Sequence, residues 1–168
     1  QGNTQVSEEI LRELHLPAYI DAIEKEVGTI MATYNSWNGK KVHGYKYLLT
    51  DLLKTELGFN GFIISDWKGV DQVNSDYKEA IKQSINAGVD MVMVPDRYKD
   101  FIGLTIELVN ENQIPISRIN DAVSRILKQK LLLGIFEKPY AEESSTEIDL
   151  FGSQEHRDIA RQAVRESM

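Results

Sequence analysis

Asp66 is the carboxylate whose place in the sequence most strongly suggests chemistry. It follows the apolar run at 62–64, which is typical of a buried strand, and it directly precedes Trp67. A carboxylate held at the end of such a strand can act as a nucleophile, a general base or a metal ligand. The ring of Trp67 offers a flat apolar face of the kind that stacks on a sugar ring. These two neighbours suggest a site that binds and attacks one ligand.

Other polar residues near the ends of predicted strands could extend this site. Tyr34 lies near the end of one apolar run, and Asp96 follows the run at 89–94. Each candidate also has an ordinary structural role open to it. Asp66 could cap a helix or bond a loop, Trp67 could pack beneath the next helix, and Tyr34 suits the end of a strand. The residue types alone leave these roles open.

The elements that would position these residues alternate along the chain. Apolar runs predict strands at 29–35, 61–65 and 89–94. Helical patterns are predicted at 7–26 with a break at Pro17, and at 47–57, 76–87, 98–112, 117–134 and 153–168. We expect helices to be capped by Ser7 and Ser117 and ended by Gly28, Gly58 and Gly88. The predicted buried face of the helix at 117–134 comprises Ile119, Ala122, Val123, Ile126 and Leu127.

The order of these elements predicts an α/β protein. Helices separate the strands, and each strand is apolar on both faces, which is the pattern of a parallel sheet covered on both sides. A (β/α)8 barrel and an open doubly wound sheet both fit this pattern, and three strands cannot close a barrel that needs eight. In either architecture the carboxyl ends of the strands bring Tyr34, Asp66 and Asp96 to one edge.

The composition argues against several classes of function. The 168-residue chain has a net charge of −7 and no basic block, which argues against a nucleic-acid surface. It has no cysteine, so disulfides and thiolate chemistry are excluded. No apolar run approaches the roughly 18 residues of a membrane span. His15, His43 and His156 lack metal-ligand spacing, and His43 is interpreted as a loop residue. Asp90 precedes an apolar run, so we expect it to bond backbone at a strand start.

The segment Gly-Phe-Asn-Gly-Phe-Ile-Ile-Ser-Asp-Trp at 58–67 resembles the signature around the catalytic nucleophile of glycoside hydrolase family 3. This family includes β-glucosidases and β-glucan exohydrolases. The resemblance continues in the family's order at 15–23, 28–67, 85–95 and 116–139, and the segment at 155–168 resembles the entry to the family's second domain. It therefore covers practically the whole chain.

The resemblance implies a role for each site residue. Asp66 matches the nucleophile that forms a covalent glycosyl-enzyme, Tyr34 an aromatic hydroxyl beside it, and Trp67 an aromatic ring that stacks on the sugar. Ser-Asp-Trp rather than Ser-Asp-Asp favours the glucosidase and exohydrolase branch. The implied enzyme is a retaining, exo-acting hydrolase that releases glucose from β-glucans, cello-oligosaccharides or β-glucosides, with no metal or cofactor. A β-xylosidase or β-N-acetylglucosaminidase is the alternative.

The resemblance also implies a domain organisation. Residues 1–134 would supply the later part of a (β/α)8 TIM-like barrel, about three βα units of it. Residues 135–152 would be an interdomain linker, and 153–168 the first helix of a second α/β domain. The remaining barrel strands, the Lys-His sugar-binding motif and the general acid/base would come from the rest of the protein. Because three strands expose two edges and an apolar face, the 168-residue piece alone is expected neither to fold stably nor to be active.

Two interpretations lie outside catalysis on sugars. A phosphoacceptor signalling domain also ends a strand on Asp, but it needs an acidic pair and a Lys at the neighbouring strand ends, which this chain lacks. A non-catalytic carbohydrate-binding domain would keep Trp67 without needing Asp66. The expected partner is a β-linked glucan or oligosaccharide, not nucleic acid or a membrane. The compartment stays open, with a secreted or periplasmic location favoured over a cytoplasmic one.

Overall fold

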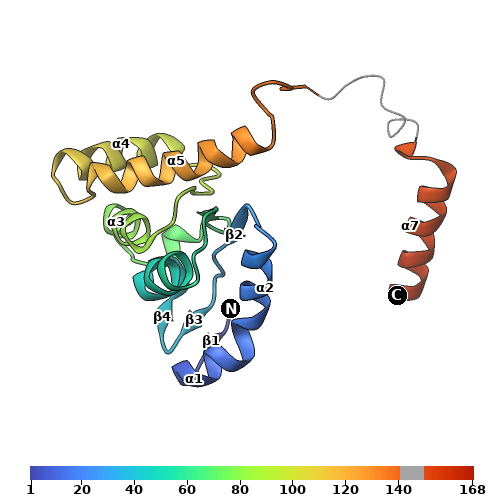
Figure 1. Ribbon diagram of the computed structural model, residues 1–168, viewed down its shortest axis with the longest axis horizontal. Coiled ribbons are helices and arrows are strands. Elements are labelled where there is room, and N and C mark those ends of the chain that lie inside the picture. The colour runs from blue at the N-terminus through green and yellow to red at the C-terminus, as the bar shows by residue number, and fades with distance from the viewer. Residues whose placement is uncertain (141–149) are drawn as a thin grey trace. The chain divides into compact units, whose positions relative to one another are not determined.

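The structure, a computed structural model, describes residues 1–140 and 150–168. These residues fall into two compact units, Gln1–Leu132 and Leu133–Met168 (Figure 1). The first unit contains β1 (Asn3–Thr4), α1 (Glu8–Ile10), η1 (Leu11–His15), α2 (Pro17–Glu24), β2 (Thr29–Met31), β3 (Ser36–Trp37), β4 (Lys40–Lys41), η2 (Val42–Gly44), η3 (Tyr47–Glu56), β5 (Phe62–Ile64), η4 (Val70–Gln72), α3 (Tyr77–Ala87), α4 (Tyr98–Asn110) and α5 (Ile116–Leu132). The second unit contains α7 (Gln154–Ser167).

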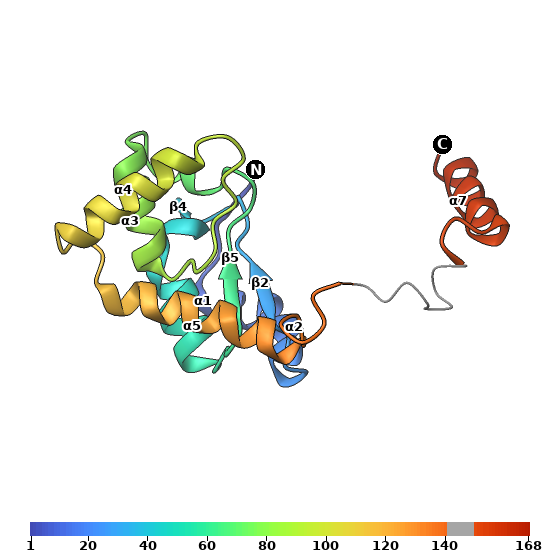
Figure 2. The same cartoon turned by 90° about the horizontal axis from the view of Figure 1, so that it is seen from above.

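A parallel pair of strands lies at the centre of the first unit. β2 and β5 pair with Ile30 opposite Ile63, and Figure 2 shows the two strands side by side. The parallel pairing predicted for these two segments is therefore confirmed. A separate small sheet has the order β1-β3-β4. Its β3–β4 hairpin turns through Asn38 and Gly39, whose φ angles of 49° and 84° are the left-handed values that a tight hairpin needs.

The third predicted strand, at 89–94, is only partly right. Met91 forms a single parallel bridge to Ile64, and no regular strand is assigned there. The N–H groups of Asp90 and Met91 both donate to the Ile63 carbonyl, at 2.8 and 3.1 Å. Further along the segment, the Met93 N–H donates to the hydroxyl of Ser65, the residue that follows β5, at 2.8 Å and not to a backbone carbonyl. The segment at 89–94 lies alongside β5, but these irregular hydrogen bonds interrupt the regular pattern of a parallel β-sheet.

The core is built around β5. Ile63 is fully buried and packs with Leu49 and Leu53 of η3 and with Val89. A neighbouring cluster joins α3 to α4, with Ile81, Ile85, Leu108 and Ile114 among its members. At about 25 cal/mol per Å² of buried apolar surface, such clusters are the main stabilisation of the strand that ends at Asp66.

The ends of the helices test the predicted caps. The Ser7 hydroxyl accepts from the Ile10 N–H, as predicted for an N-cap. Gly58 and Gly88 follow η3 and α3 with φ values of 71° and 121°, so both predicted stops are confirmed. The prediction that Gly28 ends the first helical segment is wrong. α2 ends at Glu24, and Glu26 takes the left-handed conformation with φ 57°.

The start and the buried face of α5 also differ from the prediction. The helix begins at Ile116, so Ser117 lies in its first turn and is not the N-cap. Ala122 is buried, but Val123 and Leu127 are 48% and 43% exposed. Residues 1–132 therefore cover only part of the apolar face of α5.

The amino end of the sheet carries a buried network of charges. Asp90 accepts the Ile63 N–H at 2.7 Å, which confirms its predicted role at a strand start. Its fully buried carboxylate also pairs with Lys54 at 2.8 Å and with Arg118. Asp121 pairs with Arg118 and lies 3.9 Å from Lys54. Burial lowers the pKa of Lys54 to about 8, against the opposing pull of Asp90.

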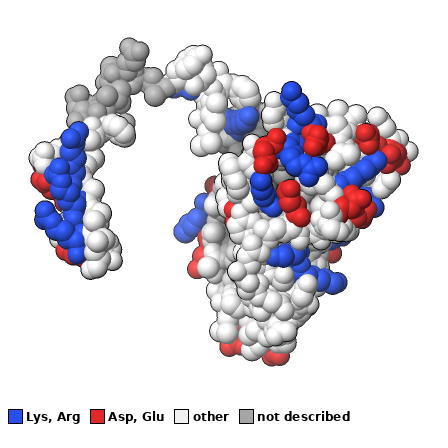
Figure 3. All heavy atoms as spheres, turned by 180° about the vertical axis from the view of Figure 1, so that it is seen from behind, with Lys and Arg blue, Asp and Glu red and all other residues white. Residues whose placement is uncertain are grey.

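The exposed charges are arranged more loosely. Figure 3 shows basic and acidic side chains interspersed on one face of the first unit. Lys78 of α3, for example, pairs with Glu107 and Glu111 at the α4 end, at 3.1 and 2.9 Å. Exposed pairs of this kind contribute about 0–1 kcal/mol each, so the buried network is the stronger constraint.

The second unit confirms the helix predicted at its end. α7 begins after Ser153, whose hydroxyl accepts from the His156 N–H. Residues 141–149 of the predicted linker at 135–152 lie outside the described residues. Within the described ranges, no helix has both the length and the apolar character needed to cross a membrane.

Candidate active site at the carboxyl ends of the strands

Tyr34, Asp66 and Trp67 lie together where β2 and β5 end. The Tyr34 hydroxyl donates to the backbone carbonyl of Trp67. Desolvation, together with the adjacent Asp66 carboxylate, raises the pKa of Tyr34, because a nearby negative charge disfavours the phenolate. The predicted neighbours are thus brought to one place, with a neutral phenol beside a carboxylate.

The backbone of Asp66 is held by two buried side chains. Its N–H donates to Nε2 of His43 at 3.0 Å, and its carbonyl accepts from the Ser65 hydroxyl at 2.9 Å. Ser65 is itself fully buried and accepts the Met93 N–H at 2.8 Å. Both the backbone N–H and the backbone carbonyl of Asp66 are therefore held by hydrogen bonds.

The carboxylate of Asp66 remains available. Its Oδ1 accepts the Trp67 N–H at 2.7 Å, which is a local loop contact. Among the described residues, Asp66 forms no ion pair with a Lys, Arg or His. Because an anion without a counter-charge is a better nucleophile than a neutralised one, this environment suits attack on a carbon centre.

Trp67 points away from the core. Its side chain is 59% exposed, so the alternative role of packing beneath the next helix is not what the structure has. The following residue, Lys68, takes the left-handed conformation with φ 54° and donates its N–H to the Met93 carbonyl at 3.3 Å. This tight turn holds the indole at the surface beside Asp66.

Asp96, the other acid considered from the sequence, is paired elsewhere. Its carboxylate lies 2.7 Å from Nζ of Lys68, and that hydrogen bond lowers the pKa of Asp96. A general acid for glycoside cleavage needs a raised pKa so that it carries a proton near neutral pH. Asp96 is therefore poorly suited to that role.

His43 is the residue at this site that the sequence interpretation missed. It was expected to be an ordinary loop residue, but it lies in η2 and is only 1% exposed. Its ring centroid is 6.2 Å from that of Tyr34, and its Nε2 bonds Asp66. The sequence contains one trace of this contact, a glycine at position 69. In the structure, a Cβ at Gly69 would lie 2.2 Å from Nε2 of His43.

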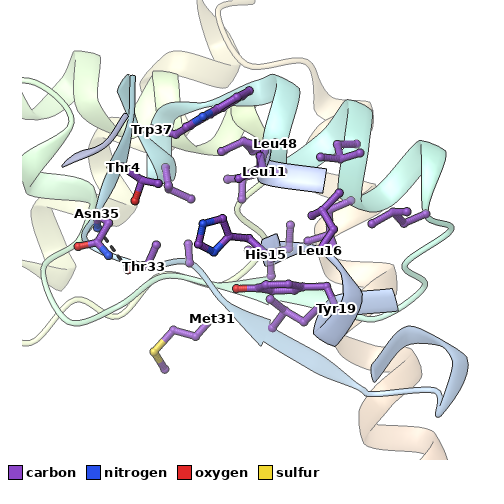
Figure 4. A pocket seen from close by; sticks show the side chains of 18 of the residues that line it. Thr4, Leu11, His15, Leu16, Tyr19, Met31, Thr33, Asn35, Trp37 and Leu48 are labelled. Carbon is purple, nitrogen blue, oxygen red and sulfur yellow. Dashed lines mark hydrogen bonds between the residues drawn. The ribbon is translucent and has the colours of Figure 1, made fainter. Parts of the chain in front are cut away.

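A cavity of about 350 Å³ lies apart from these residues. Figure 4 shows His15, Tyr19 and Trp37 among the side chains around it. Neither Asp66, Tyr34 nor Trp67 lines it, and none of its described lining residues is an Asp or Glu. The cavity therefore offers no carboxylate for acid or nucleophilic chemistry.

The side chains that could ligate a metal are scattered. Within residues 1–140 and 150–168, no cluster of three or more His, Cys, Asp or Glu side chains is arranged to hold a metal ion. The groups that the site itself offers to a ligand are a carboxylate, a phenol and an indole.

An α/β domain with a carboxylate and an exposed indole at the ends of parallel strands is the kind of framework on which sugar-cleaving enzymes are built. The chain belongs to glycosyl hydrolase family 3, since the family model described as "Glycosyl hydrolase family 3 N terminal domain" matches residues 1–129.

Curated relatives support this placement. A protein named lysosomal beta glucosidase from Dictyostelium discoideum is 34% identical over 97% of this chain, which spans 21% of that relative. A beta-xylosidase from Formosa agariphila is 34% identical over 99% of the chain, which spans 24% of it. The chain thus spans between a fifth and a quarter of the length of these two relatives.

Solved structures have the same fold over nearly the whole chain. An exo-1,3/1,4-beta-glucanase from a Pseudoalteromonas species matches with a TM-score of 0.86 and 47% identity, covering 99% of this chain and 21% of that one. A beta-glucosidase from Listeria innocua in complex with glucose matches with a TM-score of 0.82 and 32% identity, covering 96% and 22%.

Proposed function

We propose that this chain is part of a retaining, exo-acting β-glycoside hydrolase in which Asp66 is the nucleophile. The observation that carries the proposal is the Asp66 carboxylate, which has no counter-charge among the described residues and lies beside the exposed ring of Trp67. Its backbone is held by Ser65 and His43, so the carboxylate has little freedom to drift from an attacking position. Membership of glycosyl hydrolase family 3 supports the same reaction class.

In this mechanism the ionised Asp66 attacks the anomeric carbon of the sugar. The bond from that carbon to the leaving oxygen breaks, its electron pair goes to that oxygen, and a second carboxylic acid supplies the proton. A covalent glycosyl-enzyme forms. The second carboxyl group, now a carboxylate, then removes a proton from a water molecule; this water attacks the same carbon, and the bond from that carbon to Asp66 breaks. Tyr34 keeps a neutral hydroxyl beside the nucleophile, bonded to the Trp67 carbonyl, and Trp67 stacks on the sugar.

The second carboxylic acid is proposed to come from outside this chain. Retaining enzymes place the two carboxyl groups roughly 5–5.5 Å apart, and Asp96 is engaged with Lys68. The greater length of the relatives leaves room for a further domain that supplies the acid/base.

We further propose that residues 1–134 belong to a (β/α)8 TIM-like barrel, as its last three βα units from residue 28 onward with the preceding helices. Residues 135–152 would link it to a second α/β domain that begins at 153–168. The exposed apolar side chains of α4 and α5, such as Ile102, Ile106 and Leu131, support this arrangement because they need cover that residues 1–132 do not provide.

The proposed substrates are β-glucans, cello-oligosaccharides or β-glucosides from which glucose is released. The names of the beta-glucosidase and exo-beta-glucanase relatives support glucose as the sugar. β-Xylosidase activity is the second candidate, because one relative with 34% identity carries that name. Rates of the intact protein on aryl β-glucoside, β-xyloside and β-N-acetylglucosaminide distinguish these specificities.

The nucleophile is tested by trapping. The intact protein is incubated with a 2-fluoro-β-glucoside, whose fluorine slows breakdown of the glycosyl-enzyme, and the labelled peptide is sequenced. We expect one label per active site, on Asp66. A label on any other residue would overturn the assignment, and binding without label or turnover would favour a non-catalytic carbohydrate-binding domain.

A further inference from the structure

We propose that His43 is a positioning residue for the nucleophile: its neutral imidazole accepts the Asp66 N–H, and protonation of the ring releases that hold. The inference rests on the proposed role of Asp66. It adds to that role a second group whose charge state decides whether the carboxylate is held in place.

The hydrogen bond to Asp66 defines the protonation state of His43. Nε2 of the ring accepts the Asp66 N–H at 3.0 Å, so this nitrogen carries no proton. The other ring nitrogen then carries the proton of the neutral form, and the nearby backbone of Thr33 acts to raise the pKa of the ring. Thr33 follows β2 and Asp66 follows β5, so the ring links the ends of the two paired strands.

The ring has little room to move. His43 is 1% exposed, and a Cβ at Gly69 would lie 2.2 Å from its Nε2. Gly69 in turn donates its N–H to the Asp66 carbonyl at 3.0 Å. The absence of a side chain at Gly69 therefore allows the turn after Trp67 to close against the imidazole.

The charged groups near His43 shift the pKa of its ring in opposite directions. Burial is the largest influence and lowers the pKa of the ring; the Asp66 carboxylate opposes this, and Lys41 reinforces it. Lys41 is held nearby, with Nζ bonded to the Tyr34 carbonyl at 2.8 Å and to Gln72 at 3.1 Å. The Tyr34 phenol is a further titratable neighbour; its pKa is raised, so it stays neutral.

Protonation of the ring would remove its hold on the nucleophile. A protonated Nε2 is a donor that faces the donor N–H of Asp66, so the bond is lost and the two groups repel. Because the pKa of His43 is held below its usual range, this happens only in acid. Protonation of His43 should then contribute its own fall in rate on the acid side of the pH–rate profile.

Ser65 provides a matched control. Its hydroxyl also holds the Asp66 backbone, at 2.9 Å, but it does not titrate in acid. The Ser65→Ala variant should therefore lower the rate at every pH without changing the number of protonations. His43→Gln keeps an acceptor oxygen near the position of Nε2 and removes the titration, whereas His43→Leu removes both.

The experiment measures kcat and KM of the intact protein on an aryl β-glucoside from neutral to acidic pH. For the wild type we expect log(kcat/KM) to fall more steeply on the acid side than for His43→Gln, by about one unit of slope. For His43→Gln we expect the steeper acid fall to be lost, with a neutral-pH kcat between those of the wild type and His43→Leu. For His43→Leu we expect kcat to fall by about 10–100-fold with KM little changed, because only positioning is lost.

Each result bears on the inference separately from the function of Asp66. An unchanged slope in His43→Gln, or full kcat in His43→Leu, would overturn the role of His43. If His43→Leu does not fold, the slope of His43→Gln still decides. Asp66→Asn is measured in the same series: if this variant turned over normally, the nucleophile itself would be wrong, whereas an inactive Asp66→Asn with an unchanged His43→Gln slope refutes the positioning role alone.

Discussion

Asp66 and Asp90 are two aspartates beside the same buried strand, β5: Asp66 follows its carboxyl end, and Asp90 bonds its middle residue. Asp90 accepts the N–H of Ile63 within β5 and pairs with Lys54 and Arg118. Asp66 follows the strand at its carboxyl end, and no cation pairs with it among the described residues. The Asp90 carboxylate thus has a backbone N–H and two cations as partners, whereas the Asp66 carboxylate accepts a local backbone N–H.

The contrast shows how the same side chain can be neutralised by buried partners or left accessible at the end of a strand. A buried carboxylate must be neutralised, because leaving it without partners costs several kcal/mol. Asp90 therefore needs its two cations and contributes to stability. Asp66 is only partly buried and forms no ion pair among the described residues, so its carboxylate is accessible to a substrate. The division matches parallel α/β folds, in which the carboxyl ends of the strands carry the chemistry.

The largest expected effect comes from changing the reactive carboxylate. Asp66→Asn should lower kcat on an aryl β-glucoside by roughly 10⁴-fold or more, since an amide cannot form the glycosyl-enzyme. Stability should change by no more than about 0.5 kcal/mol, because the amide oxygen can still accept the Trp67 N–H. Steady-state rates and thermal denaturation of the intact protein measure both. A large loss of stability would show that Asp66 resembles Asp90 after all.

The structural carboxylate should respond in the opposite way. Asp90→Asn should destabilise the fold by about 3–5 kcal/mol, because Lys54 and Arg118 lose their shared buried partner. The kcat of the folded enzyme, measured well below its melting temperature, should stay near wild type. Asp100→Asn is the control, since it breaks only the exposed 3.2 Å pair with Arg97. Equal melting temperatures for the two variants would contradict the comparison.

The two tryptophans extend the comparison to aromatic side chains. Trp67→Ala should raise KM about tenfold, equivalent to ~1.4 kcal/mol of lost binding, with little change in melting temperature. Trp37 is buried and stacks on Tyr45, with ring centroids 5.7 Å apart. Trp37→Ala should instead cost about 3–5 kcal/mol of stability. An unchanged KM in Trp67→Ala would remove the indole from the substrate site.

The smallest effect is expected in the pH dependence of stability. Burial holds the pKa of His43 in the folded state below its usual range, so the unfolded chain binds a proton that the folded chain does not. Below a pH of about 6.5, stability should therefore fall as pH falls, by up to about 1.4 kcal/mol per pH unit, until the folded His43 is protonated. His43→Gln should lack this component. Melting temperatures of the two proteins between neutral and mildly acidic pH test it, and parallel curves would contradict it.

Several features could be predicted because they depend on neighbours in the sequence. The apolar run before Asp66 predicts a buried strand, and a strand that ends on a carboxylate places it at the edge of a sheet. Asp90 could be assigned in the same way from its position before the next apolar run. The stops at Gly58 and Gly88 follow from the left-handed conformation that glycine accepts readily.

Other features depend on contacts between distant residues and could not be predicted. His43 bonds a residue 23 positions later, and no spacing rule links a loop histidine to a strand end. The segment at 89–94 has a strand-like composition, but its ladder is interrupted where Ser65 takes the N–H of Met93. The exposure of Val123 and Leu127 likewise depends on what packs against α5.

The chain's order of residues was sufficient to indicate an α/β protein, the family it resembles and the place of Asp66, because local periodicity and motifs are properties of neighbouring residues. The folded arrangement alone separated Asp66 from Asp90, exposed Trp67 and brought His43 to the backbone of Asp66. Those distinctions depend on which charges and ring nitrogens meet across strands, and such meetings arise only when segments far apart in the chain pack together.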